Sequence, residues 1–142
     1  MKRCPALIFR SRADIASRER FAEPIELRVG DVGELVRGYP IDGGCYVVIV
    51  TRGHQHDEYA LRAAVGRGAA YVGMMGSRKK AASVLDALRA DGVSDETLSN
   101  VHTPIGLSIG ALTVPELAVS VMGEVIGVRR RATPKLVEVV AR

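Results

Sequence analysis

The hydrophobic and polar positions of the chain form a repeating pattern of a short apolar run, a polar turn and a helical segment. Residues 46–50 are the clearest apolar run, and they show no polar alternation. Such a run is typical of a strand that is buried on both faces of a parallel sheet. The polar turn 51–57 follows it, and apolar residues then recur at helical spacing. We therefore predict a strand, a turn and a helix in this order.

The same pattern recurs along the chain and predicts a parallel α/β sheet with flanking helices. Further strands are predicted at 5–9, 25–29 and 69–72, and the segment 101–106 should contain the last strand and its exit turn. The segment 25–29 alternates and should lie near a sheet edge. Helices are predicted to begin at Asp31, Asp57, Ser77, Ser94 and Thr113. The last of these opens with a Thr113–Glu116 capping box and should run to about Val128, with Ala118, Met122 and Val125 on one face.

The carboxyl ends of parallel strands meet at one edge of a sheet, where α/β proteins bind ligands. We therefore expect the turns 51–57, 73–80 and 102–110 to lie side by side.

Composition indicates one domain over residues 1–128 and a basic tail over 129–142. The chain has 142 residues, of which 47% are hydrophobic and only 4% aromatic. The net charge of +4 comes from basic termini around an acidic middle, which argues against a nucleic-acid-binding core.

No segment has the length of a membrane span. The cysteines Cys4 and Cys45 lie far apart without a paired motif, which favours a cytoplasmic protein without disulfides.

The turn 73–80 has the residue types of an anion site. Gly73 and Gly76 let the backbone come close to an oxyanion, Ser77 and the free N–H groups of a helix start can donate to it, and residues 78–80 are basic. A ligand that carries phosphate fits this turn. The alternative is that Ser77 is only an N-cap and that the basic residues are solvated.

His54, His56 and Asp57 are the only cluster of metal-ligand residue types. A metal-dependent hydrolase would need further ligands, and His102 is the only other histidine. The alternatives are that Asp57 is a helix N-cap, and that the histidines are polar turn residues or hydrogen-bond a ligand. We find no nucleophile motif, so the chain is interpreted as a binding protein more readily than as an enzyme.

Four segments taken together resemble the carboxyl-terminal Rossmann-like domain of the XdhC/CoxI family: 48–58, 70–79, 102–111 and 115–120. The resemblance extends from about Ser17 to Val128, in order and at the expected spacing. It implies an accessory protein that matures molybdenum hydroxylases such as xanthine dehydrogenase or carbon monoxide dehydrogenase. Such a protein would bind the molybdenum cofactor, in its molybdopterin or dinucleotide form, and assist its sulfuration or insertion into the apoenzyme.

Partners implied by the resemblance are the hydroxylase apoenzyme and a cysteine desulfurase. The residue types of the turns and the resemblance together predict these cofactor-binding residues: Thr51, Arg52, His54, His56, Asp57, Gly73, Gly76, Ser77, Arg78, Lys79, Pro104 and Gly106.

The first strand and the glycine-rich turn of the family domain have no counterpart, because the segment 5–9 corresponds to the second strand. We therefore predict an incomplete Rossmann-like sheet without its first strand–helix unit, and NAD(P) binding is not favoured. An NAD(P)-dependent oxidoreductase fragment is the second alternative. The strands at Leu7 and Ile49 should have unpaired edges unless they pair with each other, with a second copy of the chain or with a partner chain.

Overall fold

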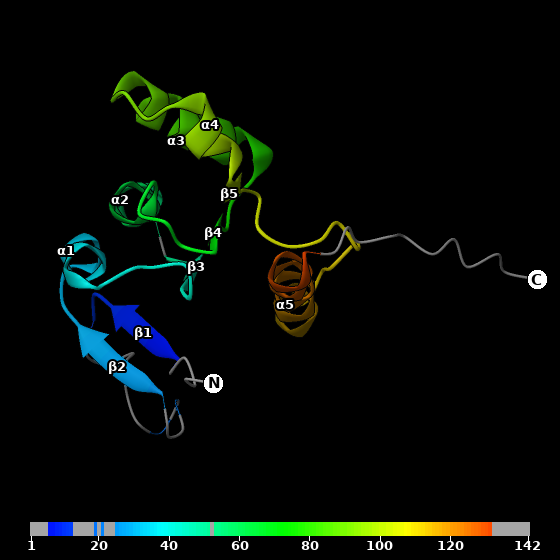
Figure 1. The fold of residues 1–142 in the computed structure, drawn as a ribbon. Helices are drawn as coiled ribbons and strands as arrows, with labels where there is room; N and C mark the ends of the chain where they lie inside the picture. Colours follow the sequence, from blue (N-terminus) through cyan, green and yellow to red (C-terminus); the bar gives the residue numbers. More distant parts are fainter. Residues whose placement is uncertain (1–5, 13–18, 20, 22–24, 52, 132–142) are drawn as a thin grey trace, which may run out of the picture.

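A computed structural model describes residues 6–12, 19, 21, 25–51 and 53–131, which form two parallel sheets with helices around them (Figure 1). The first sheet pairs β1 (Leu7–Arg10) with β2 (Glu26–Val29). The second has the order β3–β4–β5, formed by β3 (Tyr46–Ile49), β4 (Tyr71–Met74) and β5 (Val101–His102). This partial Rossmann-like arrangement confirms the predicted fold class.

Five helices lie in the described part of the chain. They are α1 (Val32–Gly38), α2 (His54–Ala64), α3 (Arg78–Ala90), α4 (Asp95–Ser99) and α5 (Val114–Arg130). None of them combines the length and the apolar character that crossing a lipid bilayer requires.

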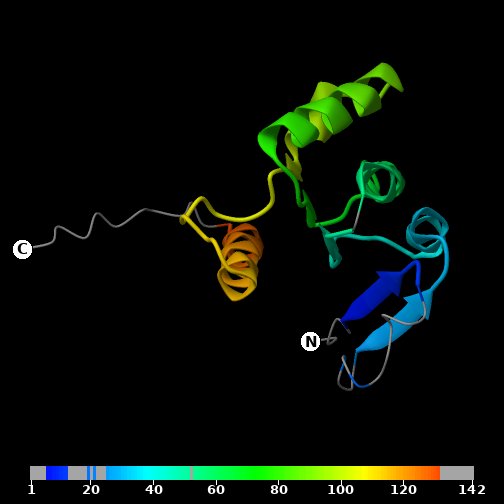
Figure 2. The same ribbon diagram turned by 180° about the vertical axis from the view of Figure 1, so that it is seen from behind.

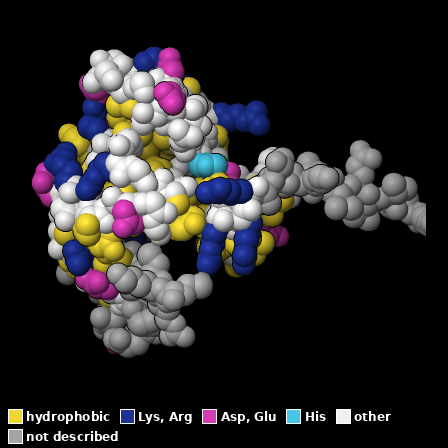
Figure 3. All heavy atoms as spheres, in the orientation of Figure 1, with side chains coloured by type: hydrophobic (Ala, Val, Ile, Leu, Met, Phe, Trp, Pro, Cys, Tyr) yellow, Lys and Arg dark blue, Asp and Glu magenta, His cyan; other side chains and the backbone are white. Residues whose placement is uncertain are grey.

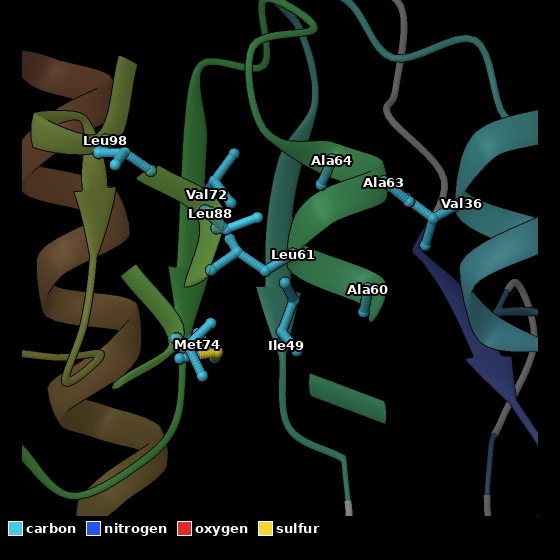
Figure 4. Packing of buried hydrophobic residues seen from close by; sticks show 11 residues of the cluster. Val36, Ile49, Ala60, Leu61, Ala63, Ala64, Val72, Met74, Leu88 and Leu98 are labelled. Carbon is cyan, nitrogen blue, oxygen red and sulfur yellow. The ribbon is translucent and has the colours of Figure 1, made fainter. Parts of the chain in front are cut away.

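The core lies between the second sheet and the helices α1 to α4 (Figure 4). Leu61 of α2, Met74 of β4 and Leu88 of α3 are fully buried there. Small side chains on α2, such as Ala60 and Ala64, let this helix approach the sheet closely. The complete cluster consists of Val36, Ile49, Ala60, Leu61, Ala63, Ala64, Val72, Met74, Val84, Leu88 and Leu98.

Helix α5 is separated from the other helices and lies on the opposite side of the β3–β5 sheet from α1 and α2 (Figures 1 and 2). Its capping box forms as predicted, since the Thr113 hydroxyl accepts from the Glu116 N–H and the Glu116 carboxylate accepts from the Thr113 N–H. The apolar face that contains Ala118 and Met122 is exposed, and the buried residue of the helix is Ser120.

Two expectations need correction. Asp57 is not an N-cap, because α2 begins at His54 after Gly53. Gly73 is not in a turn but inside β4, where an added Cβ would lie 2.5 Å from the Tyr71 hydroxyl. The last predicted strand and its exit turn are present, with β5 ending at His102.

The boundaries of the predicted tail are only partly described. Helix α5 continues past Val128 to Arg130, and residues 132–142 lie outside the described part of the chain, as does Cys4.

Candidate functional site

The three turns after β3, β4 and β5 lie together at one edge of the second sheet, as predicted. The Met75 N–H donates to the Ile49 carbonyl at 2.9 Å, which joins the second turn to the end of β3. The Ile105 N–H donates to the Met74 carbonyl at 3.1 Å, which joins the third turn to the end of β4. These bonds fix the turns relative to one another.

Asp57 holds the first turn in place from inside the protein. Its side chain is only 1% exposed. It accepts hydrogen bonds from the Thr51 N–H at 3.1 Å and from the Thr51 hydroxyl. The Lys80 ammonium donates to the other carboxylate oxygen and forms an ion pair with it. Asp57 thus connects the first turn to α3 and is directed away from solvent.

The second turn leads into α3 through a conventional cap. Ser77 is the N-cap, and its hydroxyl accepts from the Lys80 N–H at 3.2 Å. The first turn of α3 contains no acidic residue, whereas α1, α2, α4 and α5 each have at least one. The partial positive charge at the start of α3 is therefore not neutralised by an acidic side chain of the helix itself.

The three basic residues 78–80 have different roles. Lys80 is largely buried and paired with Asp57. Arg78 and Lys79 are exposed, and in the described part of the chain neither forms an ion pair. Cations at a helix start are electrostatically unfavourable. An anion that binds the free N–H groups there would reverse this effect.

Arg78 also lines a cavity of about 370 Å³ next to the third turn. The turn contributes residues 104–111, and α5 contributes Leu117 and Ser120. The Thr103–Pro104 peptide bond is cis. The cavity thus lies between the start of α3, the third turn and the start of α5.

Hydrogen bonds to α5 shape the third turn. The Gly106 N–H donates to the Glu124 carboxylate at 2.8 Å, and the Ser120 hydroxyl donates to the Leu107 carbonyl at 2.7 Å. Gly106 has a φ of 94°, and a Cβ at this position would lie 2.4 Å from the Ser120 hydroxyl oxygen. Only glycine fits this close approach. The buried Thr103 hydroxyl has no hydrogen-bond partner among the described residues.

Glu124 is a residue of the candidate site that sequence reasoning missed. Its carboxylate also accepts from the buried Tyr71 hydroxyl at 2.6 Å and lies 3.3 Å from Nδ1 of His102. The rings of Tyr71 and His102 stack with centroids 4.6 Å apart. Burial, followed by the hydrogen bond to Glu124, raises the pKa of Tyr71 far above its ordinary value. An acidic residue in the middle of the apolar residues of α5, beyond the capping Glu116, was the signal in the sequence.

The structure brings together only part of the predicted site. Arg78 lines the cavity together with Pro104 and Gly106. Gly76 and Ser77 directly precede α3, and Lys79 is exposed in its first turn. Gly73 and Asp57 face the interior and hold the site in shape. His56 is exposed on α2, whereas Arg52 and the side chain of His54 lie outside the described part of the chain. Within the described residues, no three His, Cys, Asp or Glu side chains converge as a metal site.

Comparison with known proteins identifies the domain. Residues 3–125 match the family described as the XdhC Rossmann domain. The chain is 33% identical over 106 residues to the uncharacterized protein YqeB of Escherichia coli, covering 75% of this chain and 19% of that protein. It is 31% identical over 84 residues to a Bacillus subtilis protein described as a probable xanthine dehydrogenase subunit, covering 59% of this chain and 23% of that protein.

A solved structure shows the same fold. A crystal structure from Bacillus halodurans, described as a xanthine dehydrogenase, superposes with a TM-score of 0.75 at 22% identity. The match covers 93% of this chain and 37% of the other. The chain therefore spans about a fifth of the two sequence relatives and well under half of the structural one.

Proposed function

Because the chain belongs to the XdhC family through its Rossmann domain, we propose that it is an accessory protein of a molybdenum hydroxylase of the xanthine dehydrogenase type. In this role it binds the molybdenum cofactor and presents it for sulfuration or for insertion into the apoenzyme. The name of the Bacillus subtilis relative supports the link to xanthine dehydrogenase.

The observation that carries the proposal is the unneutralised start of α3 beside the cavity. Ser77, Arg78 and Lys79 place donors and positive charge there, and the first turn of α3 has no carboxylate. The anionic end of a phosphate-bearing ligand would bind the N–H groups of this helix start. Arg78 would contribute charge-assisted hydrogen bonds, which are about twice as strong as neutral ones.

The residues around the cavity fit a cofactor that has both a phosphate and a flat ring system. The cavity of about 370 Å³ accommodates more than a phosphate group. Its wall is formed by the backbone of the third turn and by aliphatic side chains such as Ile105 and Leu117. When bound, the molybdenum cofactor supplies the metal and the pterin that the hydroxylase needs for its redox reaction. This chain's own residues hold and shield it.

Sulfuration would need a sulfur donor from outside the described residues. Cys45 directly precedes β3 and lies at the amino end of the strand, whereas the cavity is at the carboxyl edge. This thiol is therefore badly placed to transfer sulfur to a ligand in the cavity. A cysteine desulfurase that docks at the carboxyl edge is the partner that fits this geometry.

The first test is cofactor binding by a variant that lacks the free positive charge. We expect Arg78→Ala with Lys79→Ala to weaken binding by more than tenfold, because hydrogen bonds to charged groups are worth roughly 1.5–3 kcal/mol each. Binding is measured by retention of molybdenum and of pterin fluorescence after gel filtration. Arg129→Ala with Arg130→Ala is the matched control, since it removes the same charge from the exposed carboxyl end of α5. Equal retention by both variants would contradict the proposal.

A further inference from the structure

The strands β1 and β3 each have a second edge that no described strand occupies. Strand β1 pairs with β2, and β3 pairs with β4, but β1 and β3 do not pair with each other. Figure 1 shows β1, and not β2, on the side of the first sheet that is nearer to β3. We call the place between these two edges the open strand position.

Backbone groups at both edges are directed into the open strand position. The carbonyl of Arg10 accepts from Gly30, and the carbonyl of Cys45 accepts from Ala70. Successive residues of a strand direct their backbone groups to alternate sides. Leu7 and Phe9 of β1, and Tyr46 and Val48 of β3, therefore direct their N–H and carbonyl groups to the unoccupied edges.

Apolar side chains are exposed near these edges. Val48 is 44% exposed although it lies in the middle of a strand. On α5, Val119, Met122 and Ile126 are 65%, 54% and 52% exposed and recur at helical spacing. They line a shallow apolar groove together with Ala118 and Gly123. Figure 3 shows hydrophobic side chains at the surface in the region of α5.

Val48 and α5 are on the same side of the second sheet. Val48 is in register with Gly73, and paired residues of a parallel sheet direct their side chains to the same face. The face of Gly73 carries the Tyr71 hydroxyl, which donates to Glu124 of α5. The other face is already covered by α2. Helix α5 and the open strand position thus border one uncovered apolar region.

We propose that a strand–turn–helix segment of a partner polypeptide docks here. Its strand occupies the open position parallel to β1 and β3, and its helix covers Val48 and the groove on α5. A strand at this place is buried on both faces and must be apolar. Arg129 and Arg130 are exposed at the end of α5, so the helix should carry acidic residues beside its apolar stripe. The docked segment would complete the sheet that forms the cofactor site.

A second copy of the chain explains these features less well. Two α5 grooves could cover each other, but the edges of β1 and β3 would stay open. Every described strand of a second copy is already part of a sheet, and none is followed by a helix that is free to move with it. The strand edges therefore favour a partner of different sequence.

The test uses a designed peptide of about 30 residues, the length of a strand–helix unit. It contains a strand of Val and Ile, a glycine-containing turn and a helix with a leucine stripe and glutamates. We expect it to bind the 142-residue chain and to slow amide hydrogen exchange at Leu7, Phe9, Tyr46 and Val48. The same peptide with one proline in the strand, which removes a backbone donor, should bind at least tenfold more weakly.

Substitutions on α5 test the helix part of the proposal. Met122→Glu places a charge in the groove and should weaken peptide binding at least tenfold. Leu112→Glu is the matched control, because Leu112 is apolar and 90% exposed but does not line the groove. No binding of the peptide, or equal binding by the two variants, would overturn the proposal. A stable dimer in light scattering, with slow amide exchange at the same four residues in the absence of peptide, would also overturn it.

Discussion

Asp57 and Lys80 show how single residues can hold a site without contacting its ligand. Both lie in polar turns that the sequence predicts to face a ligand. In the structure they instead form an ion pair with each other in the interior. The pair also fixes Thr51 and thereby the first turn. A buried ion pair adds little net stability, but removing one partner leaves a charge without compensation.

Replacing Lys80 should therefore destabilise the protein strongly. Lys80→Met keeps the aliphatic part of the side chain and leaves the Asp57 carboxylate buried without its cation. We expect a loss of about 3–5 kcal/mol in the free energy of unfolding, measured by urea denaturation. Lys79→Met is the control, and because Lys79 is exposed it should change stability by less than about 0.5 kcal/mol.

The same pair allows a rescue experiment. Adding Asp57→Asn to Lys80→Met removes the buried charge and keeps an acceptor for the Thr51 N–H. Part of the lost stability should return. If the double variant is as unstable as the sum of the two single changes, the two residues do not act as a pair.

Individual site residues were only partly predictable, because some of their contacts are distant in the sequence. Ser77 was correctly predicted as an N-cap, since its acceptor role depends on residues three positions away. The bond from Tyr71 to Glu124 joins residues 53 positions apart and has no local signature. Gly73 was wrongly assigned to a turn, because Ile105, one of the two side chains that exclude a Cβ there, is distant in the sequence.

At the scale of elements, helix starts were the most predictable features. Asp31, Ser77, Ser94 and Thr113 all cap helices, because the capping hydrogen bond forms within one turn. The exposed face of α5 was not predictable from its own pattern. Apolar residues at helical spacing indicate that a face will be covered, but not by which element. No described helix covers this one.

The start of α5 should respond to acid. The backbone N–H groups of Thr113 and Leu112 donate to the Glu116 carboxylate and lower its pKa below the ordinary value of 4.5. A carboxylate with a lowered pKa in the fold contributes stability above its unfolded pKa, and this contribution is lost as the pH falls through the folded pKa. We expect unfolding experiments between pH 7 and about pH 3 to show this loss in the parent protein.

Glu116→Gln removes this titrating group while keeping a hydrogen-bond acceptor. Its contribution to the pH dependence should disappear, so the variant should lose less stability than the parent over the acid range. At neutral pH the variant should be the less stable protein. Identical slopes for the two proteins below pH 5 would show that the carboxylate does not stabilise the start of α5.

At the scale of the whole molecule, α1 and α2 join the two sheets. Val36 of α1 is 5% exposed and packs in the core with α2. The Arg67 guanidinium adds hydrogen bonds of 2.7 Å to the carbonyls of Val36 and Tyr39. By contrast, β1 has no fully buried residue and most of β2 is exposed. The first sheet should therefore open more easily than the second.

Truncating Val36 tests whether the two sheets form separate units of stability. Val36→Ala should cost about 2 kcal/mol in the packing between α1 and α2. If this packing holds the first sheet, hydrogen exchange should accelerate at β1 and β2 much more than at β4. Val84→Ala in α3 is the matched control, since Val84 is equally well buried in the core but lies outside the packing of α1 on α2. It should accelerate exchange at β4. If both variants accelerate exchange equally in both sheets, the two sheets are not separate units of stability. The strands on both sides of the open strand position would then belong to one cooperative core.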